Sequence, residues 1–335
     1  MLSCAFCHLG PVMSIAERPS EITLPPVNQG WPNLGEFVCS RFPRISREIW
    51  QARFASGKVH WHGGAVVAFD SPFLPSRRLC YYREVAAEPK IPFSETVIYQ
   101  DEHILVACKP HFLPVTPGGE YVNECLLERL RQRYQLTDLV AVHRLDRETA
   151  GLVLFSCQPQ SRAAYYQLFA SGQIEKSYLA VAALPTDFEY SPGQRWQVAN
   201  RLEKAQPAFL MHAVPGEVNA RSDIELLSIQ SSMQSSMQSS MQSSMQSSMQ
   251  SGMGLFRLTP HTGKTHQLRV HMQGLGLPLL NDKYYPQLQA KTALDFSQPL
   301  QLLAQQLSFT DPVTGRKHQF CSERSLQAWR GQSKI

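Results

Sequence analysis

Short apolar runs dominate the chain from residue 97 onward and predict a sheet with few helices. The runs that indicate strands lie at 97–99, 104–107, 139–142, 151–156, 177–183, 222–229 and 254–259. Helical spacing of apolar residues occurs at 121–134, 160–171 and 265–275. Because strands and helices follow one another without regular alternation, the pattern indicates an α+β fold with a mainly antiparallel mixed sheet.

The N-terminal quarter of the chain follows a different pattern. Residues 1–35 are rich in proline and glycine and lack periodicity, so we expect a flexible tail there. Residues 36–88 predict a small α/β module of two helices and a hairpin, with Ser46 as an N-cap and Gly57 as a helix stop. A proline-containing joint then leads to the main domain, which we expect to span 89–335.

One low-complexity segment interrupts the main domain. Residues 230–253 consist of five copies of Gln-Ser-Ser-Met followed by Gln-Ser-Gly-Met. A methionine at every fourth position would form an apolar stripe on a helix and could bind a groove in a partner. We favour a second interpretation, the expanded surface loop of a β-hairpin, because both flanks are typical of strands and long loops cost little free energy.

Charge and cysteine content narrow the class of protein. Lys and Arg outnumber Asp and Glu by 32 to 27, and the segment 41–83 holds eight basic residues against two acidic ones. Such a segment is typical of a protein that binds nucleic acid, although a solvated basic face without a partner has the same composition. Eight scattered cysteines do not suggest a disulfide framework, and no apolar stretch is long enough to span a membrane. We therefore expect a cytoplasmic protein that does not bind membranes.

The densest cluster of ionisable residues lies between two apolar strands. Of the seven residues 143–149, five are ionisable: His143, Arg144, Asp146, Arg147 and Glu148. Charges between buried strands cost free energy unless they are paired, so they usually serve a functional site. If the segment is extended, Asp146 lies on the same side as Arg144. A surface cluster of salt bridges in a hairpin is the alternative.

A second polar segment, 259–271, follows a strand and opens a helix for which we expect Thr265 as the N-cap. Its Gly-Lys-Thr sequence at 263–265 is not a phosphate-binding loop, because the glycine required five residues before Gly263 is replaced by Leu258. Its three histidines are five residues apart and do not share a helical face, so we expect no metal site. Arg269 lies in the first turns of the helix, from which it could reach a carboxylate of the first cluster.

Both segments resemble signature motifs of the RluA family of RNA pseudouridine synthases. The matching residues are His143-Arg144-Leu145-Asp146 with Glu148, Thr149 and Gly151, and Gly263-Lys264-Thr265-His266-Gln267-Leu268-Arg269-Val270-His271. Three weaker matches follow the family's order, from Tyr99 to Val115, from Glu175 to Ala180 and from Leu307 to Pro312. The resemblance covers about residues 94–325 and implies the pseudouridine synthase catalytic fold.

The resemblance also implies a reaction and a set of residues. Family members convert uridine in RNA to pseudouridine, for which we expect no cofactor. Asp146 matches the catalytic aspartate, Tyr178 the tyrosine that packs against the target base, and Arg269 the arginine that pairs with the aspartate. Arg144 matches a position whose side chain can fill the gap left by the flipped nucleotide. We expect further RNA contacts from Arg147, Lys264, His266, Arg47 and Lys58. Lys109 is expected either to contact the RNA backbone or to support the loop.

Residues 41–67 resemble the small S-four-type RNA-binding domain of ribosomal proteins. RNA is therefore the expected partner, with ribosomal RNA slightly favoured over transfer RNA, and we expect a monomer that requires no protein partner. Ala150 stands where a serine is common, and Phe112 and Thr116 replace a usual glycine and histidine, which leaves the choice of substrate open. The alternative function is a non-catalytic RNA-binding or RNA-chaperone protein on the same fold.

Overall fold

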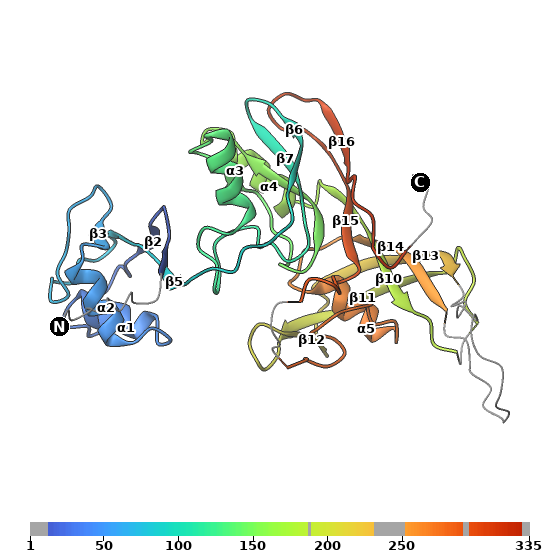
Figure 1. The fold of residues 1–335 in the computed structure, drawn as a ribbon, viewed down its shortest axis with the longest axis horizontal. Coiled ribbons are helices and arrows are strands. Elements are labelled where there is room, and N and C mark those ends of the chain that lie inside the picture. The colour runs from blue at the N-terminus through green and yellow to red at the C-terminus, as the bar shows by residue number, and fades with distance from the viewer. Residues whose placement is uncertain (1–12, 187–188, 231–251, 291–294, 330–335) are drawn as a thin grey trace, which may run out of the picture. The chain divides into compact units, whose positions relative to one another are not determined.

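The computed structural model describes residues 13–186, 189–230, 252–290 and 295–329. The chain divides into two compact units (Figure 1). The smaller, N-terminal unit comprises the described residues up to Lys90 together with Pro117–Glu128, and the larger unit comprises Ile91–Thr116 and the residues from Arg129 onward. The Gln-Ser-Ser-Met repeat lies outside the described residues, apart from its two ends on strands.

The N-terminal unit packs two helices against a small sheet. The helices are α1 (Leu34–Arg41) and α2 (Arg47–Ala55), and the sheet has the order β2 (Ser20–Thr23), β4 (Arg78–Tyr81) and β3 (Val59–Trp61). Strands β1 (Met13–Ile15) and β5 (Glu84–Ala86) form a separate antiparallel pair. The core is largely aromatic, with Trp50 fully buried. As expected, Ser46 caps α2, and Gly57 follows the helix with φ +72°.

The expected tail and domain boundary were both wrong in part. Residues 13–35 contribute strands β1 and β2, and Leu24 and Leu34 lie in the core of the unit, so this stretch is not a tail. Residues 117–128, which we expected in the main domain, belong to the N-terminal unit. The reason is local hydrogen bonding, because the Glu88 carboxylate accepts the backbone N–H groups of residues 122–124.

The larger unit is built on one long mixed sheet. Its strands are β6 (Thr96–Gln100), β7 (Ile104–Lys109), β8 (Val140–Ala141), β9 (Ala150–Ser156), β10 (Glu175–Ala183), β11 (Arg195–Lys204), β12 (Met211–Val214), β13 (Ala220–Gln230), β14 (Met253–Pro260), β15 (Leu302–Thr310) and β16 (Lys317–Cys321). The order is β12-β11-β13-β14-β10-β15-β9-β7-β6, with β8 paired to β9 and β16 to β15. Among the described residues, the β9–β15 pair is parallel and the other pairs are antiparallel. The expected α+β class with a mainly antiparallel mixed sheet is confirmed.

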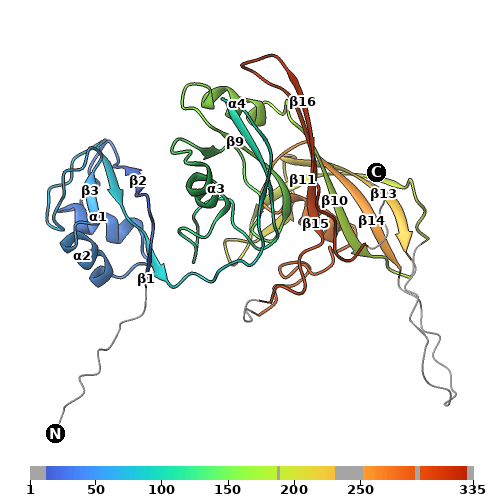
Figure 2. The same ribbon diagram turned by 45° about the horizontal axis from the view of Figure 1, so that its top comes forward.

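Two helices of the larger unit cover different parts of this sheet; both are labelled in Figure 1, and Figure 2 shows the sheet in a second view. Helix α4 (Arg162–Ala170) buries Tyr165 and Leu168 against β7 and β9. Helix α5 (Gln267–Gly274) buries Leu268 and Met272 against β10, β13 and β14. Helix α3 (Leu126–Tyr134) runs across the division between the units at residue 128. Helices α4 and α5 therefore pack over different strands of the sheet.

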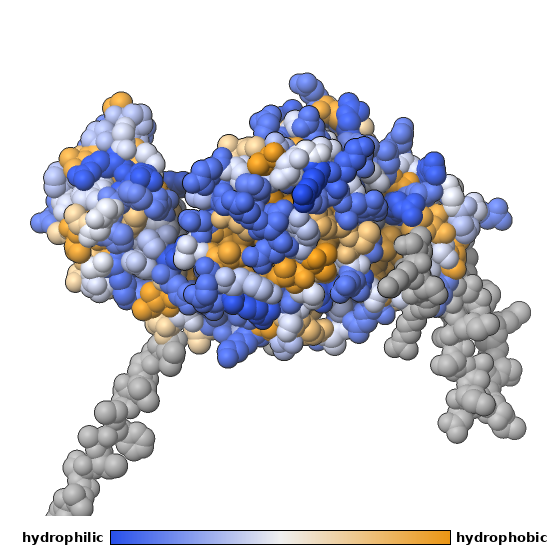
Figure 3. Space-filling view, turned by 90° about the horizontal axis from the view of Figure 1, so that it is seen from above, coloured by the Kyte–Doolittle hydropathy of each residue, from blue (hydrophilic) through white to orange (hydrophobic). Residues whose placement is uncertain are grey.

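The start of α5 differs from our expectation. Its N-cap is His266, which adopts a left-handed conformation with φ +52°, and Thr265 lies one position before it. The helix therefore begins at a residue in the left-handed region, which is costly for a residue other than glycine. In the part of the chain that the structure describes, no helix is long and apolar enough to cross a membrane. The face shown in Figure 3 is largely hydrophilic, with scattered apolar residues.

Candidate active site

The loop between β8 and β9 holds Asp146 in a fixed frame. The backbone N–H of Leu154 donates to His143 Nε2 at 3.0 Å, and the N–H of Thr149 donates to the carbonyl of Asp146 at 3.1 Å. Immediately after the loop, Gly151 has φ +115°, and a Cβ at this position would lie 2.2 Å from the carbonyl oxygen of Ala304 in β15. Only glycine permits this close approach of β9 to β15. The loop is thus anchored at both ends.

Lys109 supports this loop from inside the protein. Its side chain is fully buried, and Nζ donates to the carbonyls of Pro110, Leu113 and Arg147 at 3.0, 2.7 and 3.0 Å. Burial lowers the pKa of Lys109 to about 7, while the carboxylates of Glu148 and Asp146 act in the opposite direction. Of the two roles expected of Lys109, contact with the RNA backbone or support of the loop, these enclosed donors, already bonded to backbone carbonyls, favour the second.

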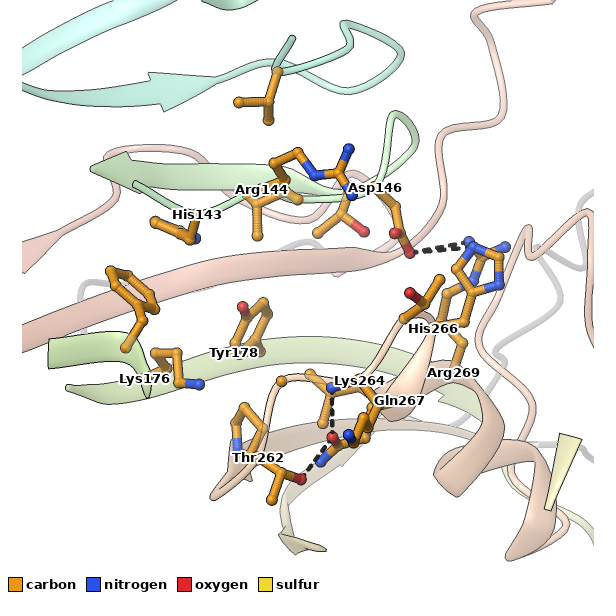
Figure 4. Close-up of a pocket in the computed structure, with 18 of the residues that line it drawn as sticks. His143, Arg144, Asp146, Lys176, Tyr178, Thr262, Lys264, His266, Gln267 and Arg269 are labelled. Carbon is orange, nitrogen blue, oxygen red and sulfur yellow. Dashed lines mark hydrogen bonds and ion pairs between the residues drawn. The ribbon is translucent and has the colours of Figure 1, made fainter. Parts of the chain in front are cut away.

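Arg269 joins the two polar segments, as the sequence suggested. Its Nη1 donates to Asp146 Oδ2 at 3.3 Å, and its Nε and Nη2 donate to the Asp282 carboxylate at 2.8 and 2.6 Å. Arg269 and Asp282 are each 1% exposed, whereas the side chain of Asp146 is 29% exposed. Burial alone would lower the pKa of Arg269, but the two carboxylates raise it above its ordinary value. The guanidinium is thus a permanent positive charge fixed behind a carboxylate that faces solvent (Figure 4).

Tyr178 and His266 border the same carboxylate. Tyr178 lies on β10, where the pairing register with β15 shifts between Ser177 and Tyr178. Burial, together with the charge of Asp146, raises the pKa of Tyr178 well above its ordinary value, so the ring carries a neutral hydroxyl. His266 Nε2 lies 3.8 Å from Asp146 Oδ2, and its side chain is 8% exposed. The structure therefore gathers around Asp146 the residues that the motifs suggested.

A cavity of about 720 Å³ opens in front of these residues. Its charged lining consists of one carboxylate, Asp146, and the basic residues Arg144, Arg147, Lys176, Lys264 and Arg269. An excess of cations in a cleft attracts an anion and raises its local concentration. The cavity is large enough for a nucleotide-sized group, since ligand pockets commonly measure roughly 300–1,000 Å³.

The loop after β14 fixes one wall of the cavity. Gln267 Oε1 accepts a hydrogen bond from the Thr262 hydroxyl at 2.8 Å and from the Lys264 backbone N–H at 3.0 Å (Figure 4). Gln267 Nε2 donates to the carbonyl of Arg221 and to the Ser222 hydroxyl, both at 2.9 Å. This buried amide holds the loop closed while the Lys264 side chain remains exposed. Sequence reasoning missed this bracing role of Gln267.

Sequence reasoning also missed Lys176, which lies two residues before Tyr178 on β10 and lines the same cavity. It makes no ion pair with the described residues, and burial lowers its pKa. At the same end of the cavity, the His143 ring stacks on Phe169 with a centroid distance of 4.5 Å. The signal that could have found Lys176 is the period of two along a strand, which places Lys176 on the same face as Tyr178.

The other residues that we expected to contact RNA are divided between the cavity and the N-terminal unit. Arg144 is exposed at the rim of the cavity, and Arg147 pairs with Glu148 at 2.6 Å. In the N-terminal unit, two basic residues expected to bind RNA form ion pairs, Arg47 with Glu36 and Lys58 with Glu84. The side chain of Arg47 is 49% exposed and that of Lys58 is 29% exposed. Both belong to the N-terminal unit and not to the cavity lining.

Known proteins share this architecture. Residues 103–274 match a family model described as RNA pseudouridylate synthase. An uncharacterised RNA pseudouridine synthase of Synechocystis is 27% identical over 253 residues, covering 75% of this chain and 78% of that protein. The dual-specificity RNA pseudouridine synthase RluA of Vibrio vulnificus is 31% identical over 238 residues, covering 67% and 80%. The solved structure of human RNA pseudouridylate synthase domain containing 1 has a TM-score of 0.53 at 20% identity, covering 71% of this chain and 86% of that one.

Proposed function

Because the chain belongs to the RNA pseudouridylate synthase family and is an isomerase acting on RNA, we propose that Asp146 performs the sugar chemistry of this reaction. The observation that carries the proposal is the position of its carboxylate, which lies at the floor of a cationic cavity and is held from behind by Arg269 at 3.3 Å. A fixed, partly exposed carboxylate is the type of group that attacks or deprotonates a sugar without a cofactor.

The reaction rearranges two bonds within one nucleotide. The bond between C1′ of the ribose and N1 of the base breaks, the base turns, and C1′ bonds to C5. The C5 proton leaves, and N1 gains a proton, so the product is an isomer of the substrate. Asp146 serves either as the nucleophile at C1′ or as the base that leads to a glycal. Both routes use the carboxylate of Asp146, whose Oδ2 lies 3.3 Å from Arg269 Nη1.

We propose that the uracil packs against the Tyr178 ring while it turns between the two bonds. The ring lines the cavity, and its raised pKa keeps the hydroxyl neutral, so it packs against the uracil as an uncharged surface. The target must leave its stack before Asp146 can reach it. Arg144, exposed at the rim, is suited to fill the vacated position, and Lys176 and Lys264 are suited to contact the flanking phosphates.

We propose structured RNA as the substrate, with ribosomal RNA favoured over transfer RNA. The basic segment 41–83 supports this choice, since a second RNA-binding surface extends the footprint beyond one short stem. Arg47 and Lys58 would belong to this surface. Incubation with purified ribosomal RNA and transfer RNA from a strain that lacks the gene separates the two substrates, and modification confined to transfer RNA would reverse the preference.

The decisive experiment measures tritium release from RNA that carries uridine tritiated at C5. We expect release by the wild-type chain and none by Asp146→Asn, which keeps the size of the side chain and removes its charge. The matched control is Asp138→Asn, an exposed aspartate before β8, which should release tritium at the wild-type rate. Wild-type release retained in Asp146→Asn would overturn the role of Asp146. RNA binding with no release by the wild type would favour the non-catalytic alternative.

A further inference from the structure

A chain of polar groups leads from β12 through Tyr285 and His266 to Asp146. The backbone N–H of Met211 donates to Tyr285 Oη at 2.8 Å, and Tyr285 Oη lies 2.9 Å from His266 Nδ1. The other nitrogen of the same ring, His266 Nε2, lies 3.8 Å from Asp146 Oδ2. The chain runs from β12 through the segment after α5 to the strained residue that begins α5.

The first bond favours one direction for the second. Because Met211 N–H is a donor, Tyr285 Oη accepts there and retains one proton of its own to donate. Among the described residues, the acceptor within reach of that proton is His266 Nδ1. A ring that accepts at Nδ1 carries its own proton at Nε2. The Nε2–H group then points at Asp146 as a donor.

Two donors therefore converge on a single oxygen of the carboxylate. Arg269 Nη1 lies 3.3 Å from Asp146 Oδ2, and His266 Nε2 lies 3.8 Å from the same atom. We propose that His266, with its tautomer set by Tyr285, is a positioning residue that holds Asp146 Oδ2 and leaves Oδ1 as the oxygen that reacts with the ribose. The inference rests on the proposed role of Asp146 and adds which atom acts and what orients it.

The surroundings of His266 fit a neutral ring. The left-handed backbone at His266 and the buried Tyr285 fix the ring from two sides. Burial lowers the pKa of His266 and Arg269 acts in the same direction, whereas the carboxylates of Asp146 and Asp282 oppose them. The Tyr284 ring also packs against His266 at 5.4 Å between centroids. Catalytic contacts are often long without substrate and tighten in the complex, so 3.8 Å is within reach of a hydrogen bond.

Paired substitutions at His266 test the donor. His266→Leu removes the Nε2–H group and should lower kcat by about tenfold to a hundredfold, the range for a lost hydrogen bond to a charged group, with little change in KM for RNA. His266→Gln carries an N–H donor at nearly the same distance from the backbone and should recover most of kcat. His212→Leu, at an exposed position on β12, is the matched control with wild-type kinetics.

A substitution at Tyr285 tests the tautomer directly. Tyr285→Phe removes the proton donated to Nδ1, and the ¹⁵N spectrum of labelled histidine should then show loss of the acceptor-type Nδ1 signal of His266. We expect kcat to fall about twofold to tenfold, as for one neutral hydrogen bond. Tyr134→Phe, which removes a hydroxyl from an exposed tyrosine, should change neither quantity.

The outcomes separate this inference from the proposed function. If Asp146→Asn is inactive while His266→Leu keeps wild-type kcat, or raises KM alone, the positioning role is wrong and the role of Asp146 stands. An Nδ1–H signal for His266 in the wild type would overturn the assigned tautomer. If Asp146→Asn stays active, the proposed function itself fails. A lowered kcat in His266→Leu that Gln restores supports the inference.

Discussion

The buried ion pair between Arg269 and Asp282 holds the arginine that contacts Asp146. Asp282→Asn tests how much this pair contributes to the stability of the larger unit. Both side chains are 1% exposed, and two N–H groups of Arg269 donate to the carboxylate at 2.8 and 2.6 Å. In the variant an amide NH₂ faces one of these donors, and among the described residues Asp146 is the remaining charged partner of Arg269. Breaking a buried ion pair from one side costs about 3–5 kcal/mol. We expect a loss of that size in the unfolding free energy of the larger unit.

Asp282→Asn should disrupt this ion pair without disrupting the backbone around residue 282. The Asp282 Oδ1 atom also accepts the backbone N–H groups of Tyr284 and Tyr285 at 2.8 and 3.2 Å. An asparagine oxygen can keep both of these bonds, so the turn at 282–285 should persist in the variant. The expected loss is therefore electrostatic and not a collapse of the segment.

Amide hydrogen exchange gives the required free energy, because buried amides of β10 and β14 exchange through unfolding of the larger unit. The matched control is Glu203→Gln, which removes the pair between Glu203 and Arg201 at 2.7 Å. These side chains are 48% and 38% exposed, so the control should cost less than about 1 kcal/mol. If Asp282→Asn costs no more than Glu203→Gln, the argument that burial makes this pair expensive to break is refuted.

Three further variants test other parts of the larger unit. Gly151→Ala should lower Tm strongly, because its Cβ would lie 2.2 Å from the backbone oxygen of Ala304, and an unchanged thermal transition would contradict this. Burial lowers the pKa of Lys109 from 10.5 to about 7, so between these values the unfolded chain binds more protons. The stability of the wild type relative to Lys109→Met should therefore rise with pH across this window in urea titrations, and a constant difference would count against it. Lys176→Gln should weaken RNA binding and reduce the slope of log K against log salt by about one, while the exposed Lys317→Gln should not.

Strands could be predicted where apolar residues run continuously. Strand β9 is buried at every position, and its expected range of 151–156 differs from the observed one by a single residue. Strand β11 was missed because its first positions alternate between exposed and half-buried, and its first seven residues, Arg-Trp-Gln-Val-Ala-Asn-Arg, contain four polar and three apolar residues. Half-exposed strands are stabilised by their neighbours, which single-sequence patterns do not contain.

The contact between Asp146 and Arg269 was predictable from the sequence, whereas the residues that hold these two side chains in place were not. Both residues belong to the polar segments singled out in the sequence, and Arg269 lies in the first turns of a helix from which it could reach a carboxylate of the other segment. Asp282, Tyr285 and Gln267 act through contacts that depend on the tertiary fold. Asp282, for example, is 13 positions from Arg269 in a segment without a recognisable motif. The parallel pairing of β9 with β15 brings these distant segments together.

The two lysines of the site show why residue type alone does not assign a role. Lys109 was expected either to contact RNA or to support the loop, and it ends a strand in which every residue is buried and gives its three N–H donors to carbonyls. Lys176 was not selected, yet it lies beside Tyr178 and faces the cavity. Both side chains are long cations next to motif residues, and what separates them is strand orientation. A lysine after a fully apolar strand should be examined first as a support for the backbone, and a lysine two positions from a site residue on the same strand as a candidate for substrate binding.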